Sequence, residues 1–122
     1  MSFLKVLVLT IFLTGCASIN SLEPGNGQRI FIKDHSYKEI WRAAVQAVGS
    51  SLTIVQTNEK MGVIKAEAPA GMTTWGEVVG VFITEYNDGY YVEANSQKRS
   101  KLQITGQNWE KTVLSLIEVN LD

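Results

Sequence analysis

The chain has 122 residues, and its 11 Lys and Arg residues nearly balance its 12 Asp and Glu residues, which gives a formal charge of −1 at pH 7. This balance argues against a nucleic-acid-binding protein, which usually has a strongly basic face and a high isoelectric point. A single Cys and a single His exclude a disulfide framework and a zinc site built from several thiolate or imidazole ligands.

The first 15 residues have the three zones of a secretory signal. Lys5 is their only charged residue, residues 6–13 form an apolar run that only Thr10 interrupts, and Thr14 and Gly15 are small. A transmembrane helix needs about 20 apolar residues, so this run is too short to span a bilayer. Two alternatives remain for this segment. It could be a general secretory signal followed by a free structural cysteine, or it could form a buried N-terminal helix.

The motif Leu13-Thr14-Gly15-Cys16 ends this segment. On these residues the sequence resembles a bacterial lipoprotein precursor, whose lipobox places an aliphatic residue, a small residue and Gly or Ala before the lipidated Cys. The resemblance implies that Cys16 receives a diacylglycerol, that the chain is cut before Cys16, and that the new amino terminus is acylated. Three acyl chains hold a protein stably, because each buried methylene contributes about 0.8 kcal/mol. Ala17, in place of Asp, implies the outer membrane by the sorting rule of enterobacterial lipoproteins, with the domain facing the periplasm.

Residues 17–28, with the sequence ASINSLEPGNGQ, lack an apolar period and predict a flexible tether. Fully extended the tether reaches about 40 Å, and as a coil about 20 Å, so we expect the folded part to stay beside its membrane. Cleavage after Gly15 leaves about 107 residues, a length that fits one domain, which we place at 29–122.

The folded part begins with a β-prone run at 29–33, and a helix follows it. Ser36 and Glu39 fit a capping box, in which the serine oxygen accepts the glutamate amide and the glutamate accepts the serine amide. Gly49 is a suitable end for this helix. Its apolar side chains recur at spacings of three and four, and they are Ile40, Trp41, Ala44, Val45 and Val48.

Four β-prone runs separated by turns come next. The runs lie at 52–56, 63–68, 77–86 and 90–96, and the clearest turns at 58–62 and 87–89. The Asp-Gly pair of the second turn is the strongest hairpin signal in the chain. Residues 78–83 are apolar at every position, which predicts a central strand covered on both faces. Alternation in the last run predicts Tyr90, Val92 and Ala94 inward and Tyr91, Glu93 and Asn95 outward.

A second helix is expected from Asn108, and residues 102–105 form either a last short strand or a loop. The helix has one apolar stripe, made of Trp109, Val113, Leu116 and Ile117. The order β-α-β-β-β-β-α predicts an α+β fold, with an antiparallel sheet of four to five strands packed on two helices.

This element order resembles the helix-grip arrangement, which includes the domains of the C subunit of the β-barrel assembly machinery, itself a lipoprotein. It is also similar to small exported lipoproteins in which a Trp-containing helix leads into a hairpin through a Gly, here Gly62. The resemblance lies in packing positions, so Cys16 is the one functional residue that a resemblance assigns.

Residues that could carry catalysis are few. His35 lies directly before the helix cap, where we expect an exposed side chain rather than a catalytic base. Glu67, Glu77, Glu85 and Glu93 could in principle converge as an acid and base pair, but their alternation with apolar residues favours solvent-facing positions. No group of glycines forms a phosphate-binding loop after a strand. We therefore predict a protein that is not an enzyme and that needs no cofactor or metal.

Two segments are candidates for contact with a partner. The connection 68–76 carries Met72 and Trp75, residue types favoured at binding surfaces, although both could instead seal the end of the sheet. The second segment is a basic cluster of Lys98, Arg99 and Lys101. It could meet anionic headgroups, at about 1 kcal/mol per residue, or acidic wall polymer, or it could be a solvated turn that discourages edge pairing.

The anchor motif and the scarcity of catalytic residues predict a lipid-anchored, non-enzymatic envelope protein that binds a protein or envelope component near the outer membrane. One alternative is a carrier that holds a small amphipathic ligand between the sheet and the helices. Another is an inhibitor or immunity protein that inserts Met72 and Trp75 into the cleft of a wall-degrading enzyme.

Overall fold

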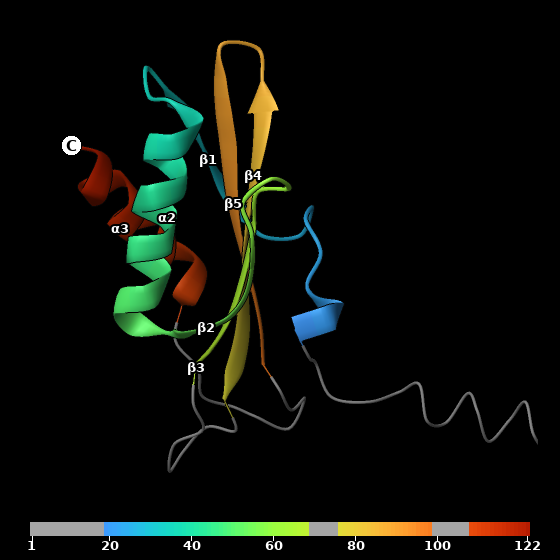
Figure 1. Cartoon of the computed structure of the whole chain (residues 1–122). Coiled ribbons are helices and arrows are strands. Elements are labelled where there is room, and N and C mark those ends of the chain that lie inside the picture. Colours follow the sequence, from blue (N-terminus) through green and yellow to red (C-terminus); the bar gives the residue numbers. More distant parts are fainter. Residues whose placement is uncertain (1–18, 69–75, 99–107) are drawn as a thin grey trace, which may run out of the picture.

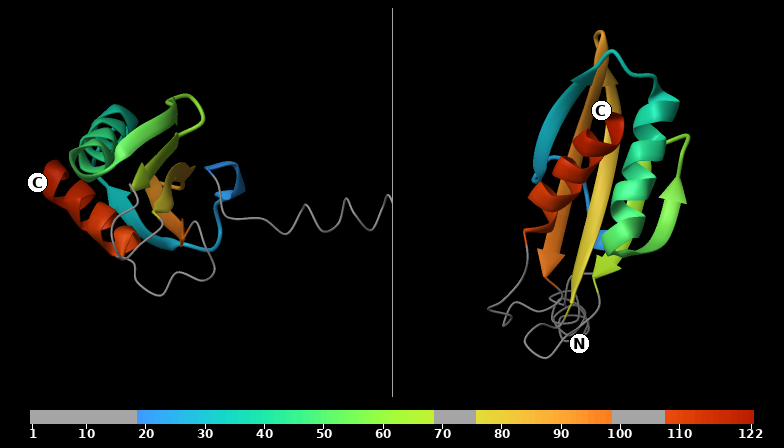
Figure 2. Two further views of the ribbon diagram at one scale, coloured as in Figure 1. Left: turned by 90° about the horizontal axis from the view of Figure 1, so that it is seen from below. Right: turned by 90° about the vertical axis from the view of Figure 1, so that its left-hand side faces the viewer.

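The computed structural model describes residues 19–68, 76–98 and 108–122. They form a five-stranded antiparallel sheet with two α-helices on one face (Figure 1, Figure 2). The elements are η1, a short 3-10 helix (Ile19–Ser21), the helices α2 (Tyr37–Ser51) and α3 (Trp109–Leu121), and the strands β1 (Gln28–Lys33), β2 (Thr53–Asn58), β3 (Val63–Ala68), β4 (Glu77–Tyr86) and β5 (Gly89–Lys98). The predicted α+β class and element order are confirmed.

The strand β4 lies at the centre of the sheet, whose strand order is β1-β5-β4-β3-β2. Val79 and Val81 point from β4 toward the helices, while Val78 and Phe82 point to the opposite face and are also buried. The expected central strand, covered on both faces, is therefore confirmed. Between the sheet and the helices the core consists of tightly buried side chains, among them Ile40, Ala44, Ile64, Val92, Val113 and Ile117.

Both hydrogen bonds of the capping box are present at the start of α2. The Glu39 N–H donates to Ser36 Oγ at 3.2 Å, and the Ser36 N–H donates to Glu39 Oε1 at 3.1 Å. The predicted stop at Gly49 was wrong, because the helix continues to Ser51. Gly49 keeps a negative φ, and the helix ends where Leu52 turns to extended backbone while its N–H still donates to Val48.

The β4–β5 hairpin turns through two residues, Asn87 and Asp88, because Tyr86 pairs directly with Gly89. Strand β5 thus begins one residue earlier than predicted. Asn87 adopts a positive φ of 52°. A Cβ on Gly89 would lie 2.5 Å from the Ile32 carbonyl oxygen, so this glycine is required by the close approach of β1.

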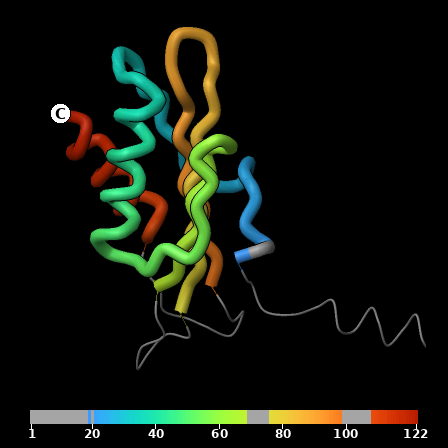
Figure 3. Tube along the Cα trace, viewed as in Figure 1, coloured from blue at the N-terminus to red at the C-terminus, as the bar shows by residue number. Residues whose placement is uncertain are grey.

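The N-terminal strap, residues 19–27, lies against the outer face of the sheet, the face opposite the helices (Figure 3). Leu22 is only 2% exposed and packs with Val78 and Phe82 in a small second core. The predicted flexible tether was therefore wrong from Ile19 onward. A sheet face that is apolar at its centre gains stability when any apolar side chain covers it, and Leu22 supplies that cover.

Hydrogen bonds to side chains of β5 hold the strap along its length. Ser21 Oγ donates to Gln97 Oε1 at 2.8 Å, Asn95 Nδ2 donates to the Glu23 carbonyl at 2.8 Å, and the N–H groups of Gly25 and Gly27 donate to Glu93 Oε2 at 2.7 and 3.2 Å. Asn95 points to the outer face as predicted, but it is buried because the strap covers it.

No helix in the described ranges is long and apolar enough to cross a membrane.

Candidate functional site

Five of the residues singled out from the sequence lie outside the described residues. These are Cys16, Met72, Trp75, Arg99 and Lys101, together with the possible strand at 102–105. Lys98 is the last residue of β5 and is exposed. It lies beside the start of β4, because Glu77 pairs with Lys98. We call this end of the sheet the tether end, and the opposite end, at Asn87 and Asp88, the hairpin end (Figure 1).

His35 supports the cap of α2. Its Nδ1 lies 3.1 Å from Glu39 Oε2, and its side chain is 28% exposed rather than freely exposed as expected. The Ser36 backbone N–H, followed by the His35 ring, holds the pKa of Glu39 below its ordinary value. The carboxylate of Glu39 therefore contacts both the Ser36 N–H and the His35 ring at the start of the helix, an arrangement typical of a structural role.

The four glutamates considered as acid and base do not converge. Glu67 and Glu93 project from the outer face, whereas Glu77 and Glu85 share the parity of Val79 and lie on the helix side. Glu93 accepts hydrogen bonds from the strap. The predicted exposure of Glu77 was wrong, since it is 5% exposed at the start of the central strand. Within the described residues, no group of His, Cys, Asp or Glu is arranged to hold a metal.

Three aromatic side chains gather on the outer face toward the hairpin end. Phe31 of β1 stacks on Tyr91 of β5 with ring centroids 5.0 Å apart, and Tyr86 of β4 lies 5.3 Å from Tyr91. The Arg29 guanidinium lies over the Tyr91 ring at 4.2 Å. Phe31 is 38% exposed and Tyr86 is 53% exposed, so a solvent-facing aromatic surface remains. We call Phe31, Tyr86, Tyr91 and Arg29 the aromatic cluster.

A hollow of about 330 Å³ separates the aromatic cluster from the strap. Pro24 of the strap forms one wall, and Thr84, Phe82 and Glu93 line the sheet side. Glu93 already accepts two N–H groups of the strap. The other groups in the hollow are aromatic rings, a guanidinium and hydroxyl groups, and they do not form a pair of nucleophile and base. Such a lining can bind a ligand or side chain but supplies no evident nucleophile and base.

The aromatic cluster was missed from the sequence. Tyr91 was expected to point outward, but Phe31 and Arg29 come from β1, whose pairing with β5 only the fold shows, with Phe31 opposite Tyr91 in the register. A usable signal was present, since Arg29 and Phe31 alternate with Ile30 and Ile32 and therefore share one face of their strand.

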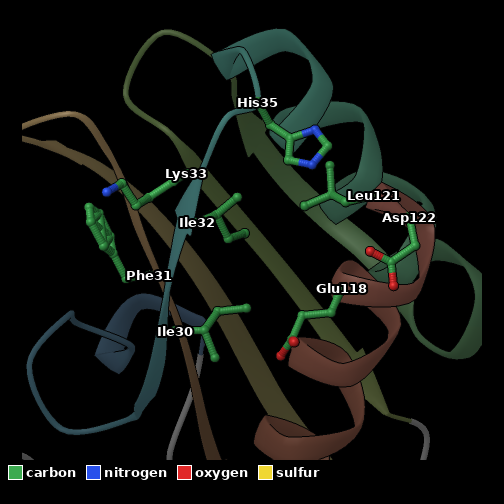
Figure 4. A pocket seen from close by; sticks show the side chains of 8 residues that line it. All are labelled: Ile30, Phe31, Ile32, Lys33, His35, Glu118, Leu121 and Asp122. Atoms are coloured by element: carbon green, nitrogen blue, oxygen red, sulfur yellow. The ribbon is translucent and has the colours of Figure 1, made fainter.

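A second hollow lies between β1 and α3 (Figure 4). It has a volume of about 470 Å³. Ile30, Ile32 and Leu121 form its apolar part, while Glu118 and Asp122 lie along the α3 side and His35 closes the hairpin end. We call this hollow the β1–α3 groove.

No family model matches the chain, and no curated protein matches it either.

Proposed function

We propose that this protein is a lipid-anchored, non-enzymatic envelope protein that binds a partner protein through the aromatic cluster. The observation that carries the proposal is the exposed pair Phe31 and Tyr86, joined through Tyr91 to the guanidinium of Arg29. Aromatic residues and Arg are enriched in the energetically important centres of protein interfaces. The lipobox at Cys16 supports attachment to a membrane.

The arrangement of the strap supports presentation of this surface away from the bilayer. The strap is packed on the sheet from Ile19, so a lipidated Cys16 would lie within about 10 Å of the domain. The strap enters near the tether end, where Ser21 bonds to Gln97. Tyr91 is seven residues from Lys98 along β5, or about 23 Å. A partner in the periplasm could reach the aromatic cluster without competing with the membrane.

The geometry favours a protein over a sugar polymer as the partner. A sugar ring binds aromatic side chains by stacking on an open ring face, but the guanidinium of Arg29 lies over a face of Tyr91. The remaining exposed surface comes from Phe31 and Tyr86 on either side, which suits an apolar side chain flanked by polar groups.

The two alternative functions have less support. A carrier would hold its ligand between the sheet and the helices, but Val81, Val92 and Ile117 fill the centre of that space and are fully buried, and the β1–α3 groove lies at its edge. The inhibitor hypothesis depends on Met72 and Trp75, which lie outside the described residues.

Site-specific photocrosslinking in cells tests the proposal. A photoreactive phenylalanine analogue at Phe31 or Tyr86 should give an adduct with one envelope protein, because both side chains are exposed in the aromatic cluster. The matched controls are Val55 and Met61, which are exposed apolar residues elsewhere on the domain and should give no such adduct. Equal adducts at all four positions, or adducts with a wall glycan, would contradict a protein-binding aromatic cluster.

The anchor has its own test. Mass analysis of the purified native protein should find an acylated Cys16 as the first residue. An unmodified thiol, or cleavage elsewhere, would remove the lipid-anchored part of the proposal and leave the crosslinking result unaffected.

A further inference from the structure

The β1–α3 groove has the features of a site for an added strand. Strand β1 is the last strand on its side of the sheet within the described residues, and β5 pairs with its inner edge alone. At the first residue of β1, the Gln28 N–H donates to Glu110 Oε1 of α3 at 3.0 Å. The outer edge of β1 faces the groove (Figure 4). An unpaired strand edge is a ready template for an extended peptide.

The two edges of the sheet differ in how well they could accept a strand. Strand β1 pairs with β5 in unbroken register over all six residues, from Gln28 to Lys33. Strand β2, at the other edge, has a register shift between Ile54 and Gln56. Irregularities of this kind protect edges from further pairing. The regular edge is therefore the one beside the groove, and the irregular edge is the protected one.

We propose that the β1–α3 groove binds an extended peptide segment of a partner protein, which adds a strand to β1 and directs alternate apolar and basic side chains against α3. This site lies apart from the aromatic cluster, and the inference does not depend on the lipid anchor. An added strand would lie about 4.8 Å from β1, with every second side chain on the face of Ile30 and Ile32. Those two residues and Leu121 make an apolar surface for them.

Charge determines which polar side chains the groove selects. The basic side chains near the hairpin end already have partners, since Lys33 Nζ lies 2.9 Å from Asp88 Oδ2 and His35 Nδ1 lies 3.1 Å from Glu39 Oε2. On α3, Glu118 and Asp122 are exposed and make no ion pair within the described ranges. The groove is thus acidic along its α3 side, and a Lys or Arg of the peptide would find a carboxylate there.

A second copy of this chain fits the groove less well. In a β1-to-β1 pair, the basic side chains Arg29 and Lys33 would lie on the outer face, because they alternate with Ile30 and Ile32. The carboxylates of Glu118 and Asp122 would then remain without a cation. A segment of another protein with basic residues on the groove side could both pair with the edge of β1 and place cations beside Glu118 and Asp122.

Fluorescence anisotropy with a labelled synthetic peptide tests the charge requirement on the purified mature protein. The peptide has threonine at every second position and isoleucine or lysine at the positions between, which would face the groove. A matched peptide has glutamate in place of lysine. The lysine peptide should bind at least about tenfold more tightly. The double variant Glu118→Lys and Asp122→Lys should abolish this preference, while Glu85→Lys, an exposed carboxylate on the hairpin, should retain it. Equal binding of the two peptides would overturn the proposal.

Hydrogen exchange tests the strand addition without any variant. Binding of the lysine peptide should slow amide exchange in β1 and leave β2, the irregular edge, unchanged. Slowing at β2 instead, or a dimer whose β1 amides are protected before peptide is added, would show that the groove has another role or that a second copy occupies it.

Discussion

Leu22 is the side chain on which the position of the strap depends. It is buried against Val78 and Phe82, and a glycine lies beneath it, since a Cβ on Gly80 would lie 3.4 Å from the Leu22 Cβ. Ile19, the other apolar residue of the strap, is half-buried. Burial of one leucine contributes about 1.5–3 kcal/mol, and the hydrogen bonds of the strap to β5 add to this contribution.

We predict that Leu22→Ala lowers the free energy of unfolding by about 3 kcal/mol, because it removes buried methyl groups and leaves a cavity over the sheet. Urea denaturation measures this change. The control is Met61→Ala, since Met61 is 68% exposed and its truncation should change stability by less than about 0.5 kcal/mol. A loss that small for Leu22→Ala would mean that the strap is not part of the cooperative fold.

At the residue scale, the sequence predicted which way a side chain points better than how deeply it is buried. Strand alternation correctly placed Asn95 on the outer face, but its burial depends on the strap, which comes from a distant part of the chain. Glu77, at the start of the central strand, is also buried, although its alternation with apolar residues predicted exposure. Leu22 itself gave no periodic signal, because it is an isolated apolar residue in a polar stretch.

At the scale of elements, the stability that the capping box gives to the start of α2 depends on pH, because the Glu39 carboxylate is part of the box. The Ser36 N–H and then the His35 ring lower the pKa of Glu39 from an ordinary value of 4.5. A carboxyl group with a lowered pKa in the folded state stabilises the fold above its ordinary pKa. That contribution is lost as the pH falls through the lowered value, so α2 should contribute to loss of stability in acid.

Glu39→Gln should reduce the dependence of stability on acid pH. Gln can still accept the Ser36 amide, so the cap geometry is kept while the titrating group is removed. The measurement is the urea midpoint at a series of pH values below about 5, where the wild type should lose more stability than the variant. Glu118→Gln, an exposed carboxylate of α3, is the control and should follow the wild type. Identical slopes for Glu39→Gln and the wild type would contradict this account.

Local sequence signals predicted most helices and strands, but they could not predict which strands pair when these are far apart in the chain. The capping box located α2, the Asp-Gly pair located the hairpin, and the apolar run 78–83 located the central strand. The pairing of β1 with β5 has no local code, because it joins segments about 60 residues apart. The aromatic cluster and the β1–α3 groove both depend on that pairing, so alternation could indicate that Arg29 and Phe31 share a face but not which residues lie beside them.

For the whole molecule, the strap and the hairpin define two ends with different neighbours. The strap begins beside Gln97 at the tether end, while the Asn87–Asp88 turn lies at the other end of β5. Ten residues of extended chain separate Asp88 from Lys98, or about 33 Å. If Cys16 carries the lipid, this length gives the domain a membrane-proximal end and a distal end.

Fluorescence quenching in vesicles can measure this orientation. We predict that a fluorophore on Lys98→Cys is quenched by headgroup-labelled lipids, because Lys98 lies at the tether end, and that one on Asp88→Cys is not. Both sites are exposed, and the lipidated Cys16 would not react with the dye. Equal quenching at the two sites would mean that the domain turns freely about its anchor.

The docked strap also determines how the protein responds to mechanical load. If Cys16 carries the lipid, tension applied through it would act first on Leu22 and on the hydrogen bonds to β5, which would open one after another as the strap separates from the sheet. The strands and helices would remain folded while nine residues were released, adding about 30 Å of reach. The same segment would thus hold the domain close at rest and act as a reversible extension when membrane and partner move apart.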